Sequence, residues 1–584
     1  MAELARADGK QKLTDQSLIK PATLRKQLFA GNNLIYTVVL AIVMFFVLYP
    51  ILLLFINSFK VGVYGQDTYW GLTNWVSAFK ENGLRSALTN TIVMSVIRQL
   101  IALIVGIIIA WILARTDLPG RNWLEFGFWV AFFLPSLSMT LSWILLLDPE
   151  KGVINKLLAE IPMLNHLNFN IFSYWGIIWV HLVTTTIAIK IMLLTPAFRN
   201  MDSSLEEAAR SCGASNGYTL FKIVTPVMAP IIFVVTLLGM IHSFESFEIE
   251  LVLGAPDGIN VYSTLIYQLV SHEPSDYGSA TVLGSLILIL LLPFILLQQW
   301  MTKKNSYATV TGKYNNQLFR LGKWRWPIFS VILFMILIIT IIPLLLLITG
   351  TFMKYFGHFA IKNPWTLKHW TEALTHPVFL GALKNTLIIA FATGILSIVL
   401  FSIIAYIIVR TKYVGRSWLD FTSWLPTTLP GVLVGLGMLW LFLGTKIFNP
   451  IYGTIFILIL ATLVAQLTRG VQVLKSNMFQ LSNELEEAAW VSGASWTYTF
   501  RKVVMPIIAP TLAVVGIMAF ATAARTTSHV ALLATSDTRP LSILQLNYMA
   551  DGSFESAAVV GVVMLFLTIG VALVARVFGL KLRG

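Results

Sequence analysis

Long apolar runs alternate with short polar segments along almost the whole chain. Twelve of these runs are long enough to cross the ~30 Å hydrocarbon core of a bilayer as helices. They form two sets of six, separated by a polar, basic segment. The runs cover residues 34–57, 87–114, 123–147, 171–194, 226–245, 280–300, 327–350, 385–409, 418–444, 451–468, 506–524 and 556–577. This pattern predicts an all-α polytopic membrane protein with about 12 transmembrane helices in two tandem six-helix repeats.

The same pattern divides the chain into four parts. We expect a cytoplasmic N-terminal segment at 1–33, a first transmembrane domain at 34–300, a cytoplasmic linker at 301–325 and a second transmembrane domain at 326–584. The first apolar run is longer than the core of a cleavable signal peptide. It is therefore expected to remain as a membrane anchor.

Short polar motifs repeat between the two halves. Asn90-Thr91, Arg115-Thr116 and Gly120-Arg121 return as Asn385-Thr386, Arg410-Thr411 and Gly415-Arg416, each 295 positions later. Because each half has an even number of spans, the repeats should share one orientation and be related by a pseudo-two-fold axis along the membrane normal.

The longest repeated motif lies in a polar loop between the fourth and fifth spans of each half. Its two copies are separated by 280 positions. The first copy contains Glu206, Glu207, Ala208, Ala209, Gly213 and Pro226, and the second contains Glu486, Glu487, Ala488, Ala489, Gly493 and Pro506. Polar identity of this length between apolar helices favours a shared function over a simple connection between spans.

Each loop has the signals of a short helix. Ser203 and Asn483 are good N-cap residues, and a glutamate follows each of them three positions later. Gly213 and Gly493 suit a C-terminal turn with positive φ. The prolines at 226 and 506 are expected to begin the next span, where a proline loses no hydrogen bond.

Composition supports the assignment to the membrane. The 584 residues are 57% hydrophobic and 12% charged, with a mean hydropathy of +0.78. The net charge of +14 is spread between spans, so it gives no basic module for nucleic acid. The single cysteine, Cys212, excludes an internal disulfide and a cysteine metal cage.

Charge also predicts the orientation. With the N-terminus in the cytoplasm, Lys and Arg concentrate on the cytoplasmic side, as the positive-inside rule requires. The segment 245–276 contains six carboxylates and no Lys or Arg, and it then lies outside. Both termini, the linker and both repeated loops are therefore expected in the cytoplasm.

Ionisable residues within spans are candidates for a translocation path, because a charge in hydrocarbon costs ~2.5–3.5 kcal/mol. Arg98 lies midway along the second span and fits either a path or an internal ion pair. Glu245 and Glu248 end the fifth span, and Arg525 takes the place of Glu245 in the second half. A gate, a substrate contact and a structural salt bridge all remain open for these residues.

Two kinds of site are not expected in this chain. It contains no Gly-x-x-x-x-Gly-Lys-[Ser/Thr] loop, so the chain is not itself an ATPase. His181, His242 and His529 are scattered without ligand spacing, so we expect no metal site and no catalytic residues.

The repeated loops resemble the signature of permease subunits of binding-protein-dependent ABC importers. The signature is Glu-Ala-Ala, three residues, Gly, nine residues, an aliphatic residue, one further residue, an aliphatic residue and Pro. Both copies fit, except that Thr225 stands where an aliphatic residue is usual. With both halves in one chain, the protein most resembles the fused permeases for ferric iron. Similar fusions serve thiamine and aminoethylphosphonate.

This resemblance implies a type I ABC importer permease fold and a set of partners. Two copies of an ABC ATPase subunit, which hold ATP and magnesium, would each seat one loop. An extracytoplasmic solute-binding protein would deliver the cargo, and the location would be a bacterial inner membrane. Ferric iron is the first expectation for the cargo, with thiamine, aminoethylphosphonate or a polyamine as alternatives. An ion-coupled secondary transporter of six plus six spans is the main rival, and a membrane-embedded enzyme is a third class.

Overall fold

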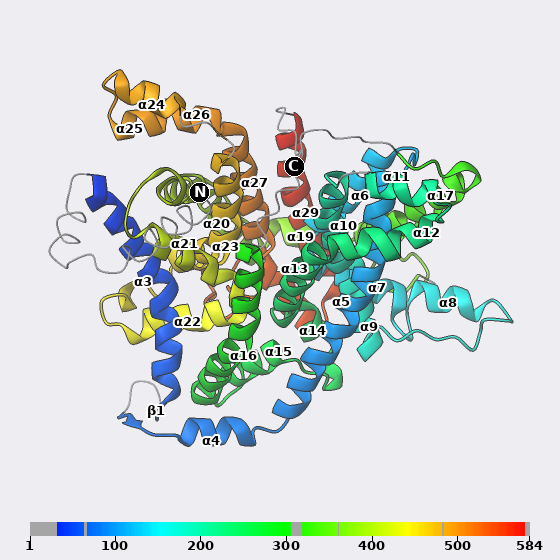
Figure 1. The fold of residues 1–584 in the computed structure, drawn as a ribbon. Coiled ribbons are helices and arrows are strands. Elements are labelled where there is room, and N and C mark those ends of the chain that lie inside the picture. The colour runs from blue at the N-terminus through cyan, green and yellow to red at the C-terminus, as the bar shows by residue number, and fades with distance from the viewer. Residues whose placement is uncertain are drawn as a thin grey trace.

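The computed structural model describes residues 32–62, 67–201, 204–304, 318–359, 361–479, 481 and 484–577. Helices make up nearly all of its regular structure (Figure 1). The two short strands, β1 (Lys60–Val61) and β2 (Tyr69–Trp70), form one antiparallel pair that follows the first span. The N-cap residues expected at Ser203 and Asn483 lie outside the described residues.

The first half contains the following helices: α3 (Asn32–Ser58), α4 (Thr73–Lys80), α5 (Leu84–Arg115), α6 (Arg121–Phe133), α7 (Ser136–Leu147), α8 (Val153–Ala159), α9 (Tyr174–His181), η1 (Leu182–Thr186), α10 (Ile187–Arg199), α11 (Ser204–Ser211), α12 (Asn216–Thr219), η2 (Leu220–Val224), α13 (Thr225–Phe244), α14 (Glu248–Leu253), η3 (Ala255–Asp257), α15 (Tyr262–Ser271) and α16 (Tyr277–Lys304).

The second half repeats this order: η4 (Gly322–Trp324), α17 (Arg325–Ile336), η5 (Leu337–Ile341), α18 (Ile342–Gly350), α19 (Lys368–Thr375), α20 (Pro377–Arg410), α21 (Arg416–Trp424), η6 (Leu425–Thr428), α22 (Gly431–Gly444), η7 (Asn449–Ile451), α23 (Ile455–Phe479), α24 (Glu484–Val491), α25 (Trp496–Thr499), η8 (Phe500–Val504), α26 (Met505–Ile507), α27 (Ala509–Arg525), α28 (Leu541–Ala550) and α29 (Phe554–Val577).

The prediction of an all-α polytopic protein is confirmed. Among the described residues, eight helices are long and apolar enough to cross a membrane, and three bent helix pairs raise that number to 11. A shorter apolar helix at Tyr277–Pro293 stands where the sixth span was expected.

The third span of each half is not a single helix. The chain turns by 100° between α6 and α7 and by 114° between α21 and α22. Leu134 and Leu429 are extended at these turns, and each precedes a proline. A proline disfavours helical geometry in the residue before it and cannot donate a backbone hydrogen bond. Pro135 and Pro430, which stand 295 positions apart, therefore produce a bend at matching places in the two halves.

Each half places its first span against the other half. Helix α3 packs on α21 and α22 of the second half as well as on α16, whereas α17 and α18 pack on α6 and α7 of the first half. This exchange joins the halves through their apolar faces.

The repeated Asn-Thr motif holds a short helix in each half. The backbone N–H of Tyr262 at the start of α15 donates to the Thr91 hydroxyl at 2.9 Å. The N–H of Leu541 at the start of α28 donates to the Thr386 hydroxyl at 2.8 Å. These contacts satisfy N–H groups that a helix N-terminus leaves without an intrahelical partner. The motif therefore repeats because its structural task repeats.

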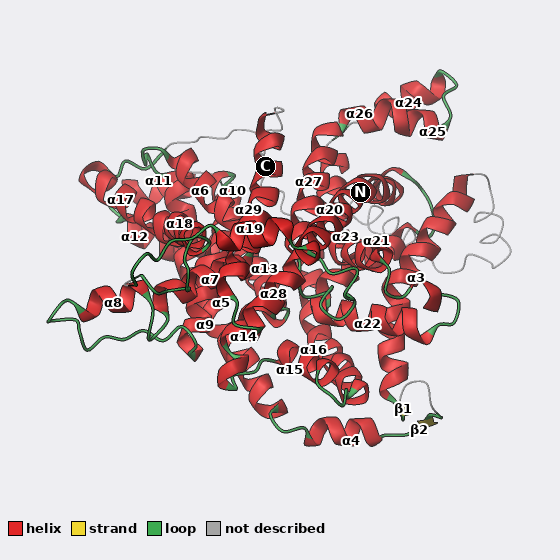
Figure 2. Ribbon diagram, turned by 180° about the vertical axis from the view of Figure 1, so that it is seen from behind, coloured by secondary structure: helices red, strands yellow, loops and turns green. Residues whose placement is uncertain are grey.

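Both repeated loops lie toward the same end of the molecule. Helices α11 and α24 are at the upper edge of Figures 1 and 2, whereas α4 and the two strands are at the lower edge. Helices α24, α25 and α26 stand away from the rest of the molecule, and α11 and α12 lie against it (Figure 2). The two loops thus share one side but differ in their setting.

Candidate coupling loops and polar path

The first glutamate of the first loop is an internal anchor. Helix α11 turns Glu206 toward the end of α5, and its side chain is fully buried. Arg115 donates to one carboxylate oxygen from Nε at 2.9 Å and from Nη2 at 2.5 Å. The indole N–H of Trp111 donates to the other oxygen at 3.2 Å. A buried carboxylate needs these partners, because burying a charge without compensation is very costly.

The second loop is held in the same way. Glu486 is buried, its Oε1 lies 3.2 Å from the Nε of Arg410, and its Oε2 accepts from the Tyr406 hydroxyl at 2.8 Å. Arg410 and Tyr406 stand 295 positions after Arg115 and Trp111. The repeated Arg-Thr motif therefore supplies the cation that fixes each loop.

The other residues of the motif lie on or near the surface. Ala208, Glu487 and Ala488 are exposed, Glu207 and Ala489 are half-buried, and Ala209 is buried. Successive residues of a helix point about 100° apart, so Glu206 and Glu207 cannot share a direction. Each helix thus has one glutamate that faces inward. The next glutamate and the alanine after it, which has only a methyl side chain, lie toward the surface.

The glycines end both helices as expected. Gly213 has φ of 81° and Gly493 has φ of 80°. The N–H of Ala214 reaches back to the carbonyl of Ala209 at 3.0 Å, and Ala494 does the same to Ala489 at 3.0 Å. This is the six-to-one bond of a helix C-terminus whose turn residue has positive φ. A side chain at either glycine would strain this backbone geometry.

The prolines lie later in their helices than the sequence predicted. The fifth span begins near Gly217, ahead of Pro226, and a π-helical turn at 220–224 precedes that proline. Pro506 follows a similar turn at 500–504. A π turn shifts the hydrogen-bond register by one residue, which accommodates a residue without an N–H.

The two loops differ beyond their prolines. The first runs into one continuous span at Gly217–Phe244, whereas the second is bent by 79° between Thr497–Ile507 and Ala509–Arg525. This bend accounts for the separation of α24 to α26 from the rest of the molecule in Figure 1.

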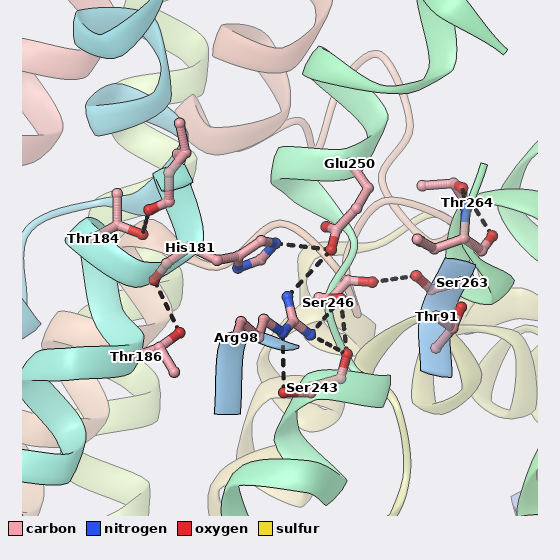
Figure 3. A network of polar contacts seen from close by, with 12 residues as sticks. Thr91, Arg98, His181, Thr184, Thr186, Ser243, Ser246, Glu250, Ser263 and Thr264 are labelled. Carbon is pink, nitrogen blue, oxygen red and sulfur yellow. Dashed lines mark hydrogen bonds and ion pairs between the residues drawn. The ribbon is translucent and has the colours of Figure 1, made fainter. Parts of the chain in front are cut away.

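Arg98 lies in a buried polar network within the first half (Figure 3). Its Nη2 donates to the Ser243 carbonyl at 2.5 Å and to the Ser246 hydroxyl at 3.1 Å. Its Nη1 lies 3.4 Å from Glu250 Oε1, and the same oxygen lies 2.8 Å from His181 Nε2. Of the two interpretations that the sequence left open for Arg98, the structure supports the internal ion pair. The guanidinium connects α5 to α14.

Two other buried polar side chains are also hydrogen-bonded. Lys190, which is 1% exposed, donates from Nζ to the Val235 carbonyl at 2.8 Å. His529 lies 3.1 Å from the Thr462 hydroxyl. In the described part of the chain, no group of three or more His, Cys, Asp or Glu side chains is placed to hold a metal ion.

A second polar cluster lies at the break between α6 and α7, where the two halves meet. Arg525 of the second half donates from Nη1 to the Phe132 carbonyl at 2.7 Å and to the Leu134 carbonyl at 3.1 Å. Glu248 of the first half accepts a hydrogen bond from Ser136, the first residue of α7. Glu248 and Arg525 also interact electrostatically. The structure thus brings these two path candidates together, and both are half-buried.

Glu245 does not belong to this cluster. Its carboxylate pairs with His242 Nδ1 at 2.7 Å, and no ion pair joins it to Arg525 among the described residues. Of the alternatives that the sequence left open, a direct salt bridge between Glu245 and Arg525 is not formed among the described residues. Their matching positions in the repeats did not bring their side chains together, because Arg525 satisfies backbone carbonyls of the opposite half.

A charge exchange tests this assignment. We expect Glu245→Arg combined with Arg525→Glu to transport no better than Arg525→Glu alone, because the exchange restores no pair. Arg525→Glu should be the more damaging single change, because it removes the donor to the α6–α7 break and places a carboxylate near Glu248. Solute uptake by membranes containing each variant measures the effect. Mutual rescue by the double variant would contradict the assignment.

Several residues of these sites were not singled out from the sequence. Trp111, Tyr406 and Glu250 had no recognised role, and His181 was named only as a histidine without metal-ligand spacing. The repeat of Arg115 as Arg410 was visible, and it was the one signal that pointed to the anchors. Their contacts join positions 91 and 80 residues apart, which no local pattern reveals.

Comparison with known proteins identifies relatives along nearly the whole chain. The family described as "Binding-protein-dependent transport system inner membrane component" matches residues 102–307 and again 398–584. The ferric transport system permease protein FbpB of Actinobacillus pleuropneumoniae is 25% identical over 564 residues, which cover 94% of this chain and 79% of that protein. The Fe(3+)-transport system permease protein FbpB 2 of Haemophilus influenzae is 23% identical over 500 residues, which cover 84% and 90%.

A solved structure is also similar in part. It is the crystal structure of a bacterial alginate ABC transporter in complex with an alginate pentasaccharide-bound periplasmic protein. It matches with a TM-score of 0.40 at 21% identity, and covers 47% of this chain and 95% of that chain.

Proposed function

Because the chain belongs to the family of binding-protein-dependent transport system inner membrane components, we propose that its two repeated loops couple solute import to ATP hydrolysis on partner subunits. The chain is the permease of an ABC importer. In the proposal, helices α11 and α24 each seat in one copy of an ABC ATPase subunit. ATP and magnesium are bound by those partners, and closure of the ATPases drives the path open toward a loaded binding protein.

One observation carries this proposal. Two loops of matching sequence lie at the same end of the molecule, and each is fixed by a buried pair between an arginine and a glutamate. An anchor of this kind transmits a push on α11 to α5 and a push on α24 to α20. A loop that only connects spans would not require a buried arginine–glutamate pair in both halves.

Ferric iron is the cargo that we propose first. The support is the likeness to two ferric transport permeases over most of the chain. Thiamine, aminoethylphosphonate and polyamines remain the alternatives for the same machinery. The proposed location is the bacterial inner membrane, with both termini cytoplasmic and the solute-binding protein on the opposite side.

The experiment combines purification with uptake. The chain is expected to copurify with an ABC ATPase from its own cells. A deletion strain should lose uptake of radiolabelled ferric iron and regain it with the intact gene. Normal iron uptake in the deletion strain, with loss of thiamine or phosphonate uptake, would reassign the cargo but retain the mechanism. Uptake that follows an ion gradient without any ATPase would instead favour a secondary transporter.

A further inference from the structure

The end of the linker between the halves binds beside the first coupling loop. Phe319 forms a parallel β-bridge with Thr116, just past the end of α5. Its N–H donates to the Arg115 carbonyl at 2.7 Å, and its carbonyl accepts from Asp117 N–H at 3.0 Å. The segment is thus attached to the residue that holds Glu206.

The Phe319 side chain continues this contact into the anchor itself. The ring is 2% exposed, and its centroid lies 5.2 Å from that of Trp111. Trp111 in turn donates to Glu206. Phe319 also belongs to the apolar cluster formed by Leu220 and Val224, which follow the loop. The end of the linker therefore supports the first loop at the end of α5, and we call this segment, residues 318–319, the brace.

The sequence of this brace occurs twice. Gln317-Leu318-Phe319 precedes the first span of the second half, and Gln27-Leu28-Phe29 precedes the first span of the first half. The two spans also occupy matching places. A Cβ added at Gly120 would meet Phe329 of α17, and one added at Gly415 would meet Leu40 of α3. The chain from Phe319 to Phe329 has almost the same length as the chain from Phe29 to Leu40.

The start of α3 lies beside the segment that corresponds to the brace site. The Thr37 hydroxyl is 3.0 Å from the Tyr413 hydroxyl, and the rings of Tyr36 and Tyr413 lie 5.8 Å apart, edge to face. Tyr413 follows Thr411 and Lys412, which correspond to Thr116 and Asp117. The N–H of Lys412 has no hydrogen-bond partner among the residues that the structure describes. Helix α3 begins at Asn32, four residues before Tyr36.

We propose that Gln27-Leu28-Phe29 binds along Thr411 and Lys412 and packs Phe29 beside Tyr406, so that the N-terminal segment braces the second coupling loop. Tyr406 donates to Glu486, just as Trp111 donates to Glu206. In this proposal the residues before α17 support the first coupling loop, and the residues before α3 support the second. The binding itself does not depend on the cargo, and its effect on transport rests on the proposed coupling function.

Disulfide cross-linking in isolated membranes tests the binding. Cys212→Ser removes the single cysteine and copies Ser492, which stands at the matching position. In that background, Ala30→Cys with Lys412→Cys corresponds to Arg320→Cys with Asp117→Cys, the pair that follows the observed bridge. We expect mild oxidant to cross-link both pairs and to leave the mismatched pair Ala30→Cys with Asp117→Cys unlinked.

Two results would overturn the proposal. One is a cross-link at Arg320 and Asp117 without any at Ala30 and Lys412. The other is equal cross-linking of the mismatched pair, which would indicate nonspecific collision. Adding Phe29→Ala should reduce the rate of the matched cross-link about tenfold, because the buried ring supplies most of the apolar contact. An unchanged rate would refute the role of Phe29, and vesicles with and without anionic lipid would reveal whether the bilayer surface holds the segment instead.

Transport gives a separate measurement. Phe29→Ala and Phe319→Ala are each expected to lower uptake and ATP hydrolysis together, since each loosens one loop. If the matched cross-link forms but neither variant affects uptake, the proposed coupling function fails while the binding stands. If the cross-link is absent and uptake is normal in Phe29→Ala, the binding fails while the coupling function stands.

Discussion

A chain that carries Glu207→Lys together with Glu487→Lys is expected to reach the membrane in normal amount and to lose ATP-driven uptake. Both glutamates lie on the outward part of their helices, whereas Glu206 and Glu486 are buried. Interface contacts at the centre of a docking site are each worth ~2 kcal/mol, so the loss of two weakens ATPase docking roughly 1,000-fold. Uptake and ATPase copurification measure the result.

The matched control has the same change of charge elsewhere on the surface. Glu150 and Glu160 are exposed in the segment around α8, and Glu150→Lys with Glu160→Lys should leave uptake unchanged. The internal anchors are intact in both double variants, so neither should lose thermal stability. Normal uptake and normal copurification in the variant of Glu207 and Glu487 would show that the coupling role is wrong.

Arg115→Ala is expected to destabilise the protein by ~3–5 kcal/mol, because it leaves the fully buried Glu206 carboxylate without its cation. Trp111 contributes a single hydrogen bond from a neutral donor, which cannot replace the two charged hydrogen bonds from Arg115. Thermal unfolding in detergent measures this loss. Uptake should fall in parallel, since α11 is no longer held against α5.

Two variants distinguish the buried charge from a general effect of losing an arginine. Arg115→Ala combined with Glu206→Gln should recover most of the stability, because no unpaired charge remains inside. Arg199→Ala breaks a more exposed pair with Glu125, in which the arginine side chain is 39% exposed, and should cost at most ~1 kcal/mol. Equal losses for Arg115→Ala and Arg199→Ala would contradict the anchor.

The local features of the coupling loops were predictable because they depend on neighbours in the chain. The positive φ of Gly213 and Gly493 follows from the end of a short helix, and the sequence predicted it. The prolines that bend the third span of each half act on the residue next to them, so they were also readable. At Pro226 the sequence predicted the start of the fifth span too late. A π turn ahead of the proline admits it inside a continuous span.

Which of the two adjacent glutamates in each loop is buried and which faces outward was not predictable. Glu206 and Glu207 carry the same side chain, and the capping position of Glu206 does not say which of the two faces inward. Which of them faces inward depends on where Arg115 lies after the chain has passed through two further spans. The partners of Arg98 were hidden for the same reason, since Glu250 is 152 positions away and looked like part of an acidic outer segment.

The sequence by itself determined the membrane-spanning helices, the duplication and the two repeated polar loops. These are set by hydrophobic length and by short-range backbone preferences, which act before the chain folds. Only the tertiary structure decided that Glu206 and Glu486 are anchors, that Arg525 contacts the break between α6 and α7 and that Glu245 pairs with His242. Side-chain charges are paired by desolvation, which penalises every buried group that lacks a partner, and the partner is chosen by packing between spans that are distant in the sequence.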